Sequence, residues 1–368
     1  MTAAQLRTAA VVGTGLIGTS VALALTARGV TTYLIDRDGS AARTAAALGA
    51  GTAGVPGDPV DLAVLAVPPG SVAAVLEEHQ KSGLATAYTD VASVKSPVLA
   101  DIEARACDLA SFVGGHPMAG RERSGPLAGL ADLFEGRPWV LTPGPETEPG
   151  VLRRALELIR LCGGVPVVLS PEDHDRAVAL VSHVPHLLAS LMAARLQNGP
   201  GYAVRLAGQG LRDVTRIAAG DAGLWTDILA TNAAAVAEVL GAVTGDLEAA
   251  LRALRALGSA DAVTARTHPA AAELAELFGR GNAGHARIPG KHGETAVSYS
   301  SVRVVLRDRM GELARLLADA SGTGANIEDI RLEHATDANA GLAELVVAGD
   351  AAGTLAGELR GCGWAVHA

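Results

Sequence analysis

The sequence contains few cysteines and few aromatic residues. Its three cysteines, Cys107, Cys162 and Cys362, lie far apart and show no C-x-x-C spacing. An odd number of scattered cysteines argues against a disulfide framework and against a zinc knuckle, and it fits a reducing, cytoplasmic setting. Aromatic side chains make up 3% of the 368 residues, so the hydrophobic cores must be built from Ala, Val, Leu and Ile.

Positive charge is also scarce. The chain has 30 Lys and Arg residues against 39 Asp and Glu, which gives a net charge of -9. Nucleic acids and anionic membrane surfaces attract basic patches, so we expect neither as a partner. Residues 8–27 carry no charge and are long enough to cross a bilayer as a helix. A signal peptide or membrane anchor is one interpretation, but the glycines in the middle of this stretch favour a strand, a tight turn and a buried helix.

The order of apolar segments predicts three domains and a linker. Over residues 1–168, short apolar runs alternate with helical patterns, which indicates an α/β domain with a parallel sheet covered on both faces. Ser170 and Pro171 are typical of a helix start, and helical patterns dominate residues 169–280. A Gly-rich linker at 281–297 precedes a strand-helix-strand-strand-helix-strand pattern at 298–368, which predicts a small α+β domain of ferredoxin-like type.

The segment GTGLIGTS contains the pattern G-x-G-x-x-G directly after a predicted strand. Gly13 permits a tight turn, Gly15 lets the backbone approach a pyrophosphate, and Gly18 lets the next helix pack on the sheet. Asp36 follows about twenty residues later, where a carboxylate holds a ribose 2′-hydroxyl of NAD, whereas the adjacent Arg37 could accommodate NADP. We therefore expect a Rossmann-type dinucleotide site that favours NAD; the alternative is a tight turn in a non-binding domain. The motif also places two apolar residues at this site, Leu16 and Ile17.

Two further loops are expected at the carboxyl edge of the sheet, where doubly wound sheets bind ligands. One carries Asp90, Ser93 and Lys95, and the other carries His116 between a glycine pair and a proline. Oxidising an alcohol with a nicotinamide cofactor requires a group that accepts the hydroxyl proton, and histidine suits this because its pKa of about 6.5 lies near working pH. His116 is thus a candidate catalytic base, and Ser93 is a candidate to orient it or to contact the nicotinamide. The alternative for His116 is a hydrogen-bonded structural residue.

The helical region adds a second group of polar residues. His183 and His186 lie three residues apart and share a helix face, which Pro185 is expected to bend. A zinc pair is one interpretation, but no third ligand with suitable spacing stands out. Asp213 and Arg216 are also three residues apart. They form either a surface ion pair or a buried pair in which the arginine binds a carboxylate substrate.

Together these segments resemble the prephenate/arogenate dehydrogenase family. The matching stretches run in the family's order: GTGLIGTS, AVPP, TDVASVK, GGHPMAG, SHVPH and LRDVTRIA with a later tryptophan. The resemblance implies oxidation of prephenate or arogenate with NAD(P), in which the ring loses a hydride and CO₂ and becomes aromatic. A 3-hydroxyacid dehydrogenase and a non-catalytic protein that senses NAD and amino acids are the alternative hypotheses.

The resemblance also implies roles for individual residues. His116 corresponds to the base on the ring hydroxyl, with Ser93 close to it and to the nicotinamide. Arg216 corresponds to the arginine that binds a substrate carboxylate, and His186 to the histidine near the substrate side chain. The residues implied to line or support the substrate pocket are His183, Asp213 and Trp225, and the AVPP stretch adds Val67 and Pro68 to the cofactor site.

Directly after HPMAG, where a small polar residue and then Glu are common in the family, this sequence has Arg121 and then Glu122, so Arg121 departs from the pattern. An arginine there favours the doubly anionic prephenate over arogenate, while Glu122 could reverse this preference. The substrate therefore stays open between the two, with prephenate favoured.

Residues 298–368 resemble an ACT domain, a regulatory module that binds amino acids, on the stretch RMGELARLLADASGTGANIEDI. We expect Asn326 and Ile327, which follow a glycine-rich turn, to bind an aromatic amino acid effector such as tyrosine. A purely dimerising module is the alternative. The helical region is rich in Ala and Leu beyond what its own core needs, which predicts a homodimer through that region.

Overall fold

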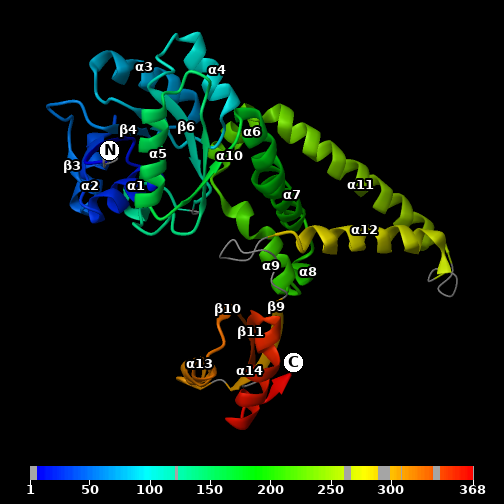
Figure 1. Cartoon of the computed structure of the whole chain (residues 1–368). Coiled ribbons are helices and arrows are strands. Elements are labelled where there is room, and N and C mark those ends of the chain that lie inside the picture. Colours follow the sequence, from blue (N-terminus) through cyan, green and yellow to red (C-terminus); the bar gives the residue numbers. More distant parts are fainter. Residues whose placement is uncertain are drawn as a thin grey trace. The chain divides into compact units, whose positions relative to one another are not determined.

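The computed structural model describes residues 6–120, 123–260, 267–288, 299–307, 309–334 and 340–367 (Figure 1). Arg121 and Glu122, which carry the question of substrate preference, lie outside these residues, as does the expected linker from 289 onward. The chain divides into two compact units, Met1–Glu248 and Ala249–Ala368, and each is described by itself.

The first unit contains an eight-stranded sheet with the strand order β3-β2-β1-β4-β5-β6-β7-β8. The strands are β1 (Thr8–Val12), β2 (Thr31–Ile35), β3 (Thr52–Ala53), β4 (Leu62–Leu65), β5 (Tyr88–Asp90), β6 (Phe112–Pro117), β7 (Pro138–Thr142) and β8 (Val165–Val168). The order of β1 to β6 is that of a Rossmann-type sheet, whose ligands bind at the carboxyl ends of the strands.

The expectation of a fully parallel sheet is wrong at one edge. Strand β7 pairs with β6 in the antiparallel direction, and β8 pairs with β7 in parallel, so the last two strands run against the first six. The physical reason is the connection between β6 and β7, whose described residues, 118–120 and 123–137, contain one short helix, the 3₁₀ helix η2 (Pro126–Ala128). A parallel neighbour requires a crossover, usually a helix, whereas an antiparallel neighbour does not.

Helices cover both faces of the sheet, as the apolar runs predict. Successive residues of β1 face opposite ways: Ala9 and Val11 pack in one core, and Ala10 and Val12 in the other. The first core includes residues of α1 (Leu16–Ala27), α2 (Gly39–Ala47) and α5 (Pro149–Leu161), and the second includes residues of α3 (Val72–Ser82) and α4 (Ser96–Ala104). The uncharged stretch at 8–27 therefore forms the buried strand β1, a turn and helix α1.

The helical region starts where the sequence predicts. The Ser170 hydroxyl accepts a hydrogen bond from the Asp173 amide, and Pro171 is the first residue of the helix. The elements are α6 (Pro171–Val178), the π-helical segment η3 (Ala179–His183), α7 (Val184–Gln197), α8 (Gly201–Arg205), α9 (Gln209–Thr215), the 3₁₀ helix η4 (Arg216–Ala219), α10 (Ala222–Thr231) and α11 (Ala233–Ser259). By length and composition alone, Pro171–Gln197 is apolar enough to cross a membrane.

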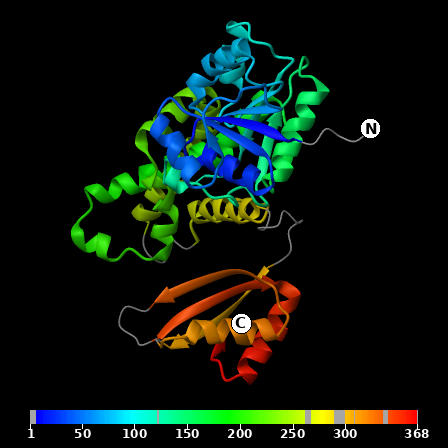
Figure 2. The ribbon, with the colours of Figure 1, turned by 90° about the vertical axis from the view of Figure 1, so that its left-hand side faces the viewer.

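The second unit contains α12 (Pro269–His285) and a four-stranded antiparallel sheet with the order β10-β11-β9-β12. Its elements are β9 (Tyr299–Arg307), α13 (Glu312–Gly322), β10 (Ile327–His334), β11 (Ala340–Ala348), α14 (Gly349–Gly361) and β12 (Val366–His367). Helices α13 and α14 pack on one face of this sheet (Figure 2). The element order is the one expected for residues 298–368.

The expected start of the Gly-rich linker, at 281, differs from the structure because α12 continues to His285. Glycine costs about 1 kcal/mol relative to alanine inside a helix, so the sequence favours an earlier end. The helix has Pro269 as its first residue and a side-chain cap from His268, whose ring accepts a hydrogen bond from the Ala270 amide. These features define where α12 begins. The helix continues through Gly279, Gly281 and Gly284 to His285.

Candidate active site

The glycine loop after β1 has the geometry that the motif requires. Gly13 has φ +97°, and a Cβ there would lie 2.2 Å from the carbonyl oxygen of Ala66. A Cβ on Gly18 would lie 1.9 Å from the carbonyl oxygen of Gly13. At Gly15, by contrast, a Cβ would meet nothing within 4 Å. Two of the glycines are therefore required by the fold, and the third leaves open space beside the start of α1.

Asp36, at the end of β2, holds this loop in place. Its Oδ2 atom accepts hydrogen bonds from the Thr14 amide at 2.6 Å and the Thr14 hydroxyl at 2.8 Å. Its Oδ1 atom accepts one from the Asp38 amide at 2.9 Å. The neighbouring Arg37 is exposed. Asp36 thus fixes the loop, a role that the motif does not reveal, and its binding of a ribose stays a prediction.

The other predicted cofactor residues lie around the same loop. Leu16 and Ile17 form the first turn of α1, whose N-cap is Gly15 and whose first turn carries no acidic residue. Val67 approaches to 3.3 Å from the position of a Cβ on Gly13, and Pro68 caps the 3₁₀ helix η1 (Pro69–Ser71). Free amides and an uncrowded helix N-terminus attract phosphate groups, so these residues fit a dinucleotide.

His116 does not lie in a loop, as its glycine and proline neighbours suggest, but near the end of strand β6, opposite Val140 of β7. The flanking glycines are needed for packing: a Cβ on Gly115 would lie 2.7 Å from the Asp90 carbonyl oxygen, and one on Gly114 would lie 2.4 Å from the Thr142 hydroxyl. The glycine pair therefore lets β6 pack closely against its neighbours, with His116 at its carboxyl end.

A chain of hydrogen bonds links His116 to the helical region. His116 Nδ1 lies 2.8 Å from His174 Nε2, and His174 Nδ1 lies 2.8 Å from Asp175 Oδ1. His174 is fully buried and Asp175 is 5% exposed. The sequence patterns assigned no role to either residue. The available signal was the helix start at Ser170, which places this adjacent polar pair in the first turns of α6.

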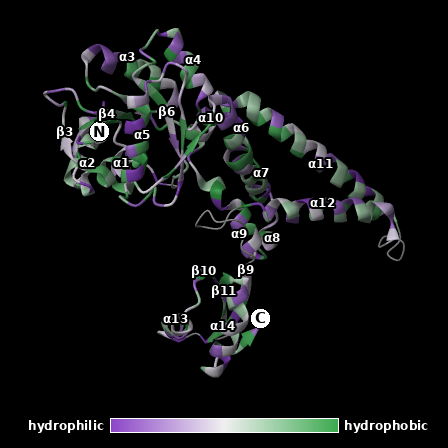
Figure 3. Cartoon of the chain, in the orientation of Figure 1, coloured by the Kyte–Doolittle hydropathy of each residue, from purple (hydrophilic) through white to green (hydrophobic). Residues whose placement is uncertain are grey.

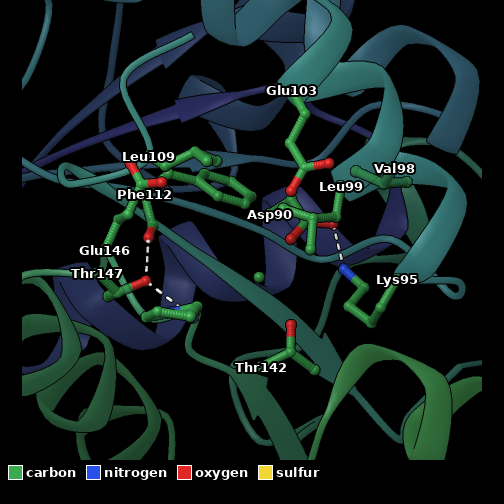
Figure 4. A pocket seen from close by; sticks show the side chains of 13 residues that line it. Asp90, Lys95, Val98, Leu99, Glu103, Leu109, Phe112, Thr142, Glu146 and Thr147 are labelled. Carbon is green, nitrogen blue, oxygen red and sulfur yellow. Dashed lines mark hydrogen bonds and ion pairs between the residues drawn. The ribbon is translucent and has the colours of Figure 1, made fainter. Parts of the chain in front are cut away.

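The backbone beside His116 is fixed by a buried ion pair. Lys95 Nζ bonds to Asp90 (Figure 4). It also donates to the Gly115 carbonyl oxygen at 2.7 Å, while Asp90 Oδ1 accepts from the Gly115 amide at 2.9 Å. Lys95 is 2% exposed and Asp90 is fully buried. Burial lowers the pKa of Lys95, and the Asp90 charge opposes that shift. The pair thus holds both backbone groups of Gly115.

The environment of His116 favours a neutral imidazole. Burial lowers its pKa well below the ordinary value, and the charges of His174, Lys95 and His183 act in the same direction. Asp175 acts in the opposite direction and raises the pKa. At neutral pH the side chain is therefore uncharged in the free protein and can accept a proton.

The predicted histidines of the helical region lie together. Trp225 stacks on His186 with ring centroids 3.6 Å apart and meets His183 edge-on at 6.3 Å. The Asn232 side chain bridges this group to α6: its Nδ2 atom lies 3.1 Å from His183 Nδ1 and donates to the Asp175 carbonyl oxygen at 2.9 Å. Burial lowers the pKa of His183 to about 4. A π-helical segment ends at His183, and Pro185 lies in the first turn of α7.

Other predicted residues are placed differently from the expectation. Ser93 is half-buried in the loop after β5. Among the side chains that the structure describes, His174, and not Ser93, makes the hydrogen bond to His116. Asp213 and Arg216 are both exposed in the single chain, and Asp213 accepts a hydrogen bond from Gln209 at 2.7 Å. The expected burial of this pair is therefore not found, because α9 ends at Thr215 and Arg216 begins the exposed turn η4.

Two further findings concern cavities and metals. A cavity of about 200 Å³ lies behind β6, against α4, and its lining includes Asp90 and Lys95 but not His116 (Figure 4). Within the described ranges, no group of three or more His, Cys, Asp or Glu side chains could hold a metal ion.

In the second unit, Asn326 is exposed just before β10, and Ile327 begins that strand and packs on its core.

Known families match both parts of this site. Residues 21–170 match the model described as prephenate dehydrogenase, nucleotide-binding domain, and residues 170–264 match prephenate dehydrogenase, dimerization domain. A probable prephenate dehydrogenase of Streptomyces niveus, NovF, is 44% identical over 334 residues, which cover 90% of this chain and 91% of that protein. The chain belongs to the prephenate dehydrogenase family. The prediction of an NAD-dependent dehydrogenase is thereby confirmed at the level of the family.

Further relatives agree with this family. The prephenate dehydrogenase of Bacillus subtilis is 33% identical over 60% of this chain and 62% of its own. The crystal structure of the Aquifex aeolicus prephenate dehydrogenase, in complex with hydroxyphenyl propionate and NAD⁺, has a TM-score of 0.65 at 26% identity and covers 76% of this chain and 99% of its own. Arogenate dehydrogenase of Synechocystis has a TM-score of 0.62 at 26% identity, covering 76% of this chain and 98% of its own.

Proposed function

We propose that the protein is a prephenate dehydrogenase, which converts prephenate to 4-hydroxyphenylpyruvate and CO₂ with NAD as the oxidant. The observation that carries the proposal is the position of His116, a half-buried, neutral imidazole at the carboxyl end of β6. Strands β1, β4, β5 and β6 run parallel, so His116 and the glycine loop belong to the same edge of the sheet. The 44% identity to the Streptomyces relative supports the same reaction.

His116 can supply the proton chemistry of this reaction. As a hydride leaves the ring carbon that bears the hydroxyl group, His116 Nε2 accepts the hydroxyl proton. The electrons of the bond to the ring carboxylate complete the aromatic ring as CO₂ departs, and His116 returns the proton to the phenol oxygen. Bound NAD supplies the acceptor for the hydride. The protein's contribution is to orient the substrate and to stabilise the charge that develops during the transfer.

Substrate binding is proposed for residues around α7. Gly220 follows η4, and a Cβ there would lie 2.6 Å from Trp225 Nε1 and 3.1 Å from His186 Cε1. The turn that begins with Arg216 therefore ends directly against the stacked His186 and Trp225. This placement supports Arg216 as the residue that binds a substrate carboxylate. His186 and Trp225 would then lie beside the substrate, and His183 would support them through its edge-on contact with Trp225.

We also propose a soluble, cytoplasmic homodimer formed through the helical region. The match of residues 170–264 to a dimerization domain supports it. Helix α7 exposes Leu191 and Met192 by 51% and 41%, and α10 exposes Leu224 by 53%. Figure 3 shows α11 largely in white and green, the colours of neutral and apolar residues. A second copy that covers such side chains would account for the apolar character of Pro171–Gln197 without a membrane.

For the C-terminal domain we propose an ACT-like regulatory module that senses an aromatic amino acid, with tyrosine as the first candidate. The antiparallel sheet with two helices on one face supports this. Asn326 and Ile327 are the proposed contacts to the effector. An Asn326→Ala variant of the full chain should lose inhibition by tyrosine and keep its uninhibited rate. Unchanged inhibition would remove Asn326 from the effector site.

The reaction is tested by following reduced cofactor with four pairs: prephenate or arogenate, each with NAD or NADP. We expect the highest kcat/KM with prephenate and NAD. A higher kcat/KM with arogenate would assign the protein as an arogenate dehydrogenase that forms tyrosine directly. No turnover with any pair would contradict the proposed function and favour the non-catalytic sensor.

A further inference from the structure

The hydrogen-bond chain from His116 to Asp175 has a definite direction. The pKa of Asp175 would be raised by burial, but hydrogen bonds from His174 and from the amides of Lys95 and Ser96 outweigh burial and hold it below the ordinary value. Asp175 is therefore an ionised acceptor, and the proton between it and His174 lies on His174 Nδ1. When His174 is neutral, its Nε2 atom can only accept, so His116 Nδ1 carries a proton and donates it.

This direction decides which nitrogen of His116 can act as a base. With a proton on Nδ1, the lone pair is on Nε2, the nitrogen that does not bond to His174. In the reverse arrangement, a doubly protonated His174 would donate to His116 Nδ1. His116 Nε2 would then carry the proton and could not accept another. Only the first arrangement is competent for the proposed reaction.

The geometry around Asp175 leaves it little freedom. Its Oδ1 accepts from the Lys95 amide at 2.8 Å and its Oδ2 from the Ser96 amide at 2.9 Å, both in the segment that leads from β5 into α4. Asn232 donates to its carbonyl oxygen at 2.9 Å. The rings of His116 and His174 meet edge-on at 72°, with centroids 5.1 Å apart. The segment between β5 and α4, Asn232 and the end of β6 therefore fix this hydrogen-bond chain before any substrate binds.

The charges near His116 make Asp175 important during the reaction. Among the largest influences on the pKa of His116, burial, His174, Lys95 and His183 oppose its protonation, and Asp175 favours it. Asp90 neutralises Lys95 directly. When His116 gains a proton at Nε2, the resulting positive charge is stabilised through His174 by the Asp175 carboxylate, as in other histidines oriented by a buried acid.

We propose that His174 and Asp175 are positioning residues, which hold His116 in the Nδ1-protonated form and stabilise the imidazolium that forms when its Nε2 accepts the substrate's hydroxyl proton. The kinetic part of this proposal rests on the proposed function. Neither residue exchanges a proton with the substrate. The hydroxyl proton moves to His116 Nε2 and returns to the phenol oxygen, while the proton on His174 Nδ1 stays shared with Asp175.

The first test is the tautomer itself, which needs no turnover. In the full-length protein with ¹⁵N-labelled histidine rings, NMR should show His116 with a protonated Nδ1 and an unprotonated Nε2. The signals are assigned by their loss in His116→Asn. Asp175→Asn should shift His116 toward the Nε2-protonated form. A wild-type protein with the proton on His116 Nε2 would overturn the proposal, whether or not prephenate is the substrate.

The second test is kinetic. Asp175→Asn should lower kcat by about 10²–10³-fold, with KM changed less than about threefold, because the tautomer affects the proton transfer and not ground-state binding. The acid limb of the kcat–pH profile should move to lower pH, since the charge that raises the pKa of His116 is lost. His174→Gln, whose amide oxygen can accept from His116 Nδ1, should retain more activity than His174→Leu.

The matched control is Asp173→Asn, in the first turn of the same helix, where the side chain is 57% exposed and pairs with Arg176. It should leave kcat, the pH profile and the tautomer unchanged. NAD affinity should be equal in all variants, which excludes a general loss of structure. An Asp175→Asn enzyme with an unmoved acid limb and an unchanged tautomer would refute the positioning role. A wild-type protein that fails to turn over prephenate would refute the proposed function. The NMR result would then decide whether His174 and Asp175 position His116.

Discussion

The two halves of the candidate active site are built from different materials. The glycine loop between Gly13 and Gly18 is contiguous and consists largely of backbone: its required features are a positive φ and the absence of two Cβ atoms. The imidazole network around His116 consists of side chains from β6, α6 and the residue after α10. Its members come from distant parts of the sequence: His116 and His174, which share a hydrogen bond, are 58 residues apart. A backbone site fails when a side chain is added, whereas a side-chain network fails when a hydrogen-bonding partner is removed.

The largest expected effect comes from removing the centre of the side-chain network. His116→Asn should lower kcat by about 10²–10⁴-fold, the usual contribution of a positioned base. NAD affinity, which depends on the glycine loop, should stay unchanged. Steady-state kinetics with prephenate and a fluorescence titration with NAD check the two statements. A variant with full kcat would show that His116 is not the base.

The buried ion pair beside Gly115 tests how much the network contributes to stability. Lys95→Met leaves Asp90 as a buried charge without a neighbouring positive charge, and it should lower the free energy of unfolding by about 3–5 kcal/mol. Lys81→Met is the control, because the exposed pair Lys81–Glu77 should contribute less than about 1 kcal/mol. Thermal unfolding followed by circular dichroism gives both values. Equal shifts in the two variants would contradict the assigned importance of burial.

In the glycine loop, one Gly→Ala substitution should lower stability, and another should weaken NAD binding instead. Gly13→Ala places a Cβ against a carbonyl oxygen at a positive φ, and it should cost about 2–4 kcal/mol of stability. Gly15→Ala meets open space and should change stability by less than about 0.5 kcal/mol. It should instead weaken NAD binding by at least about tenfold, since its Cβ enters the space expected for the pyrophosphate. Unimpaired NAD binding by Gly15→Ala would place the cofactor elsewhere.

The smallest effect is a dependence of stability on pH to which the network around His116 contributes. The pKa of His183 is about 4 in the folded protein, below its ordinary value of 6.5. Between these values the unfolded chain binds more protons, so stability is fully present above pH 6.5 and is lost as pH falls toward 4. The loss should be on the order of 1–3 kcal/mol, and the lowered pKa of His116 acts in the same direction. Urea unfolding at pH 7.5 and pH 5 measures it, and the difference should narrow in His183→Gln.

The sequence predicts these two halves unequally, for a physical reason. The glycine loop is readable because each requirement is local: a turn, a close approach and a helix start within six residues. The His116–His174–Asp175 chain depends on how α6 packs against β6, which no local pattern specifies. The antiparallel strand β7 was missed although the segment before it lacks a helical pattern long enough for a crossover. Likewise, the spacing of Asp213 and Arg216 indicates a shared helix face but not whether that face is covered, so the sequence could not decide between a surface pair and a buried one.

The π-helical turn Ala179–His183 has a consequence for engineering this protein. Such a turn accommodates one more residue than an α-helical turn would, so deleting Leu180, which is 61% exposed, can return the segment to regular α-helix. The helix on either side would keep nearly the same register, because the π turn itself takes up the extra residue. His174 and Asp175 before the turn and His186 after it would then stay on their faces. The same one-residue deletion in the regular helix α7 would instead rotate every later residue by about 100°. The segment around Leu180 is therefore where the chain can lose one codon and keep the geometry of the site.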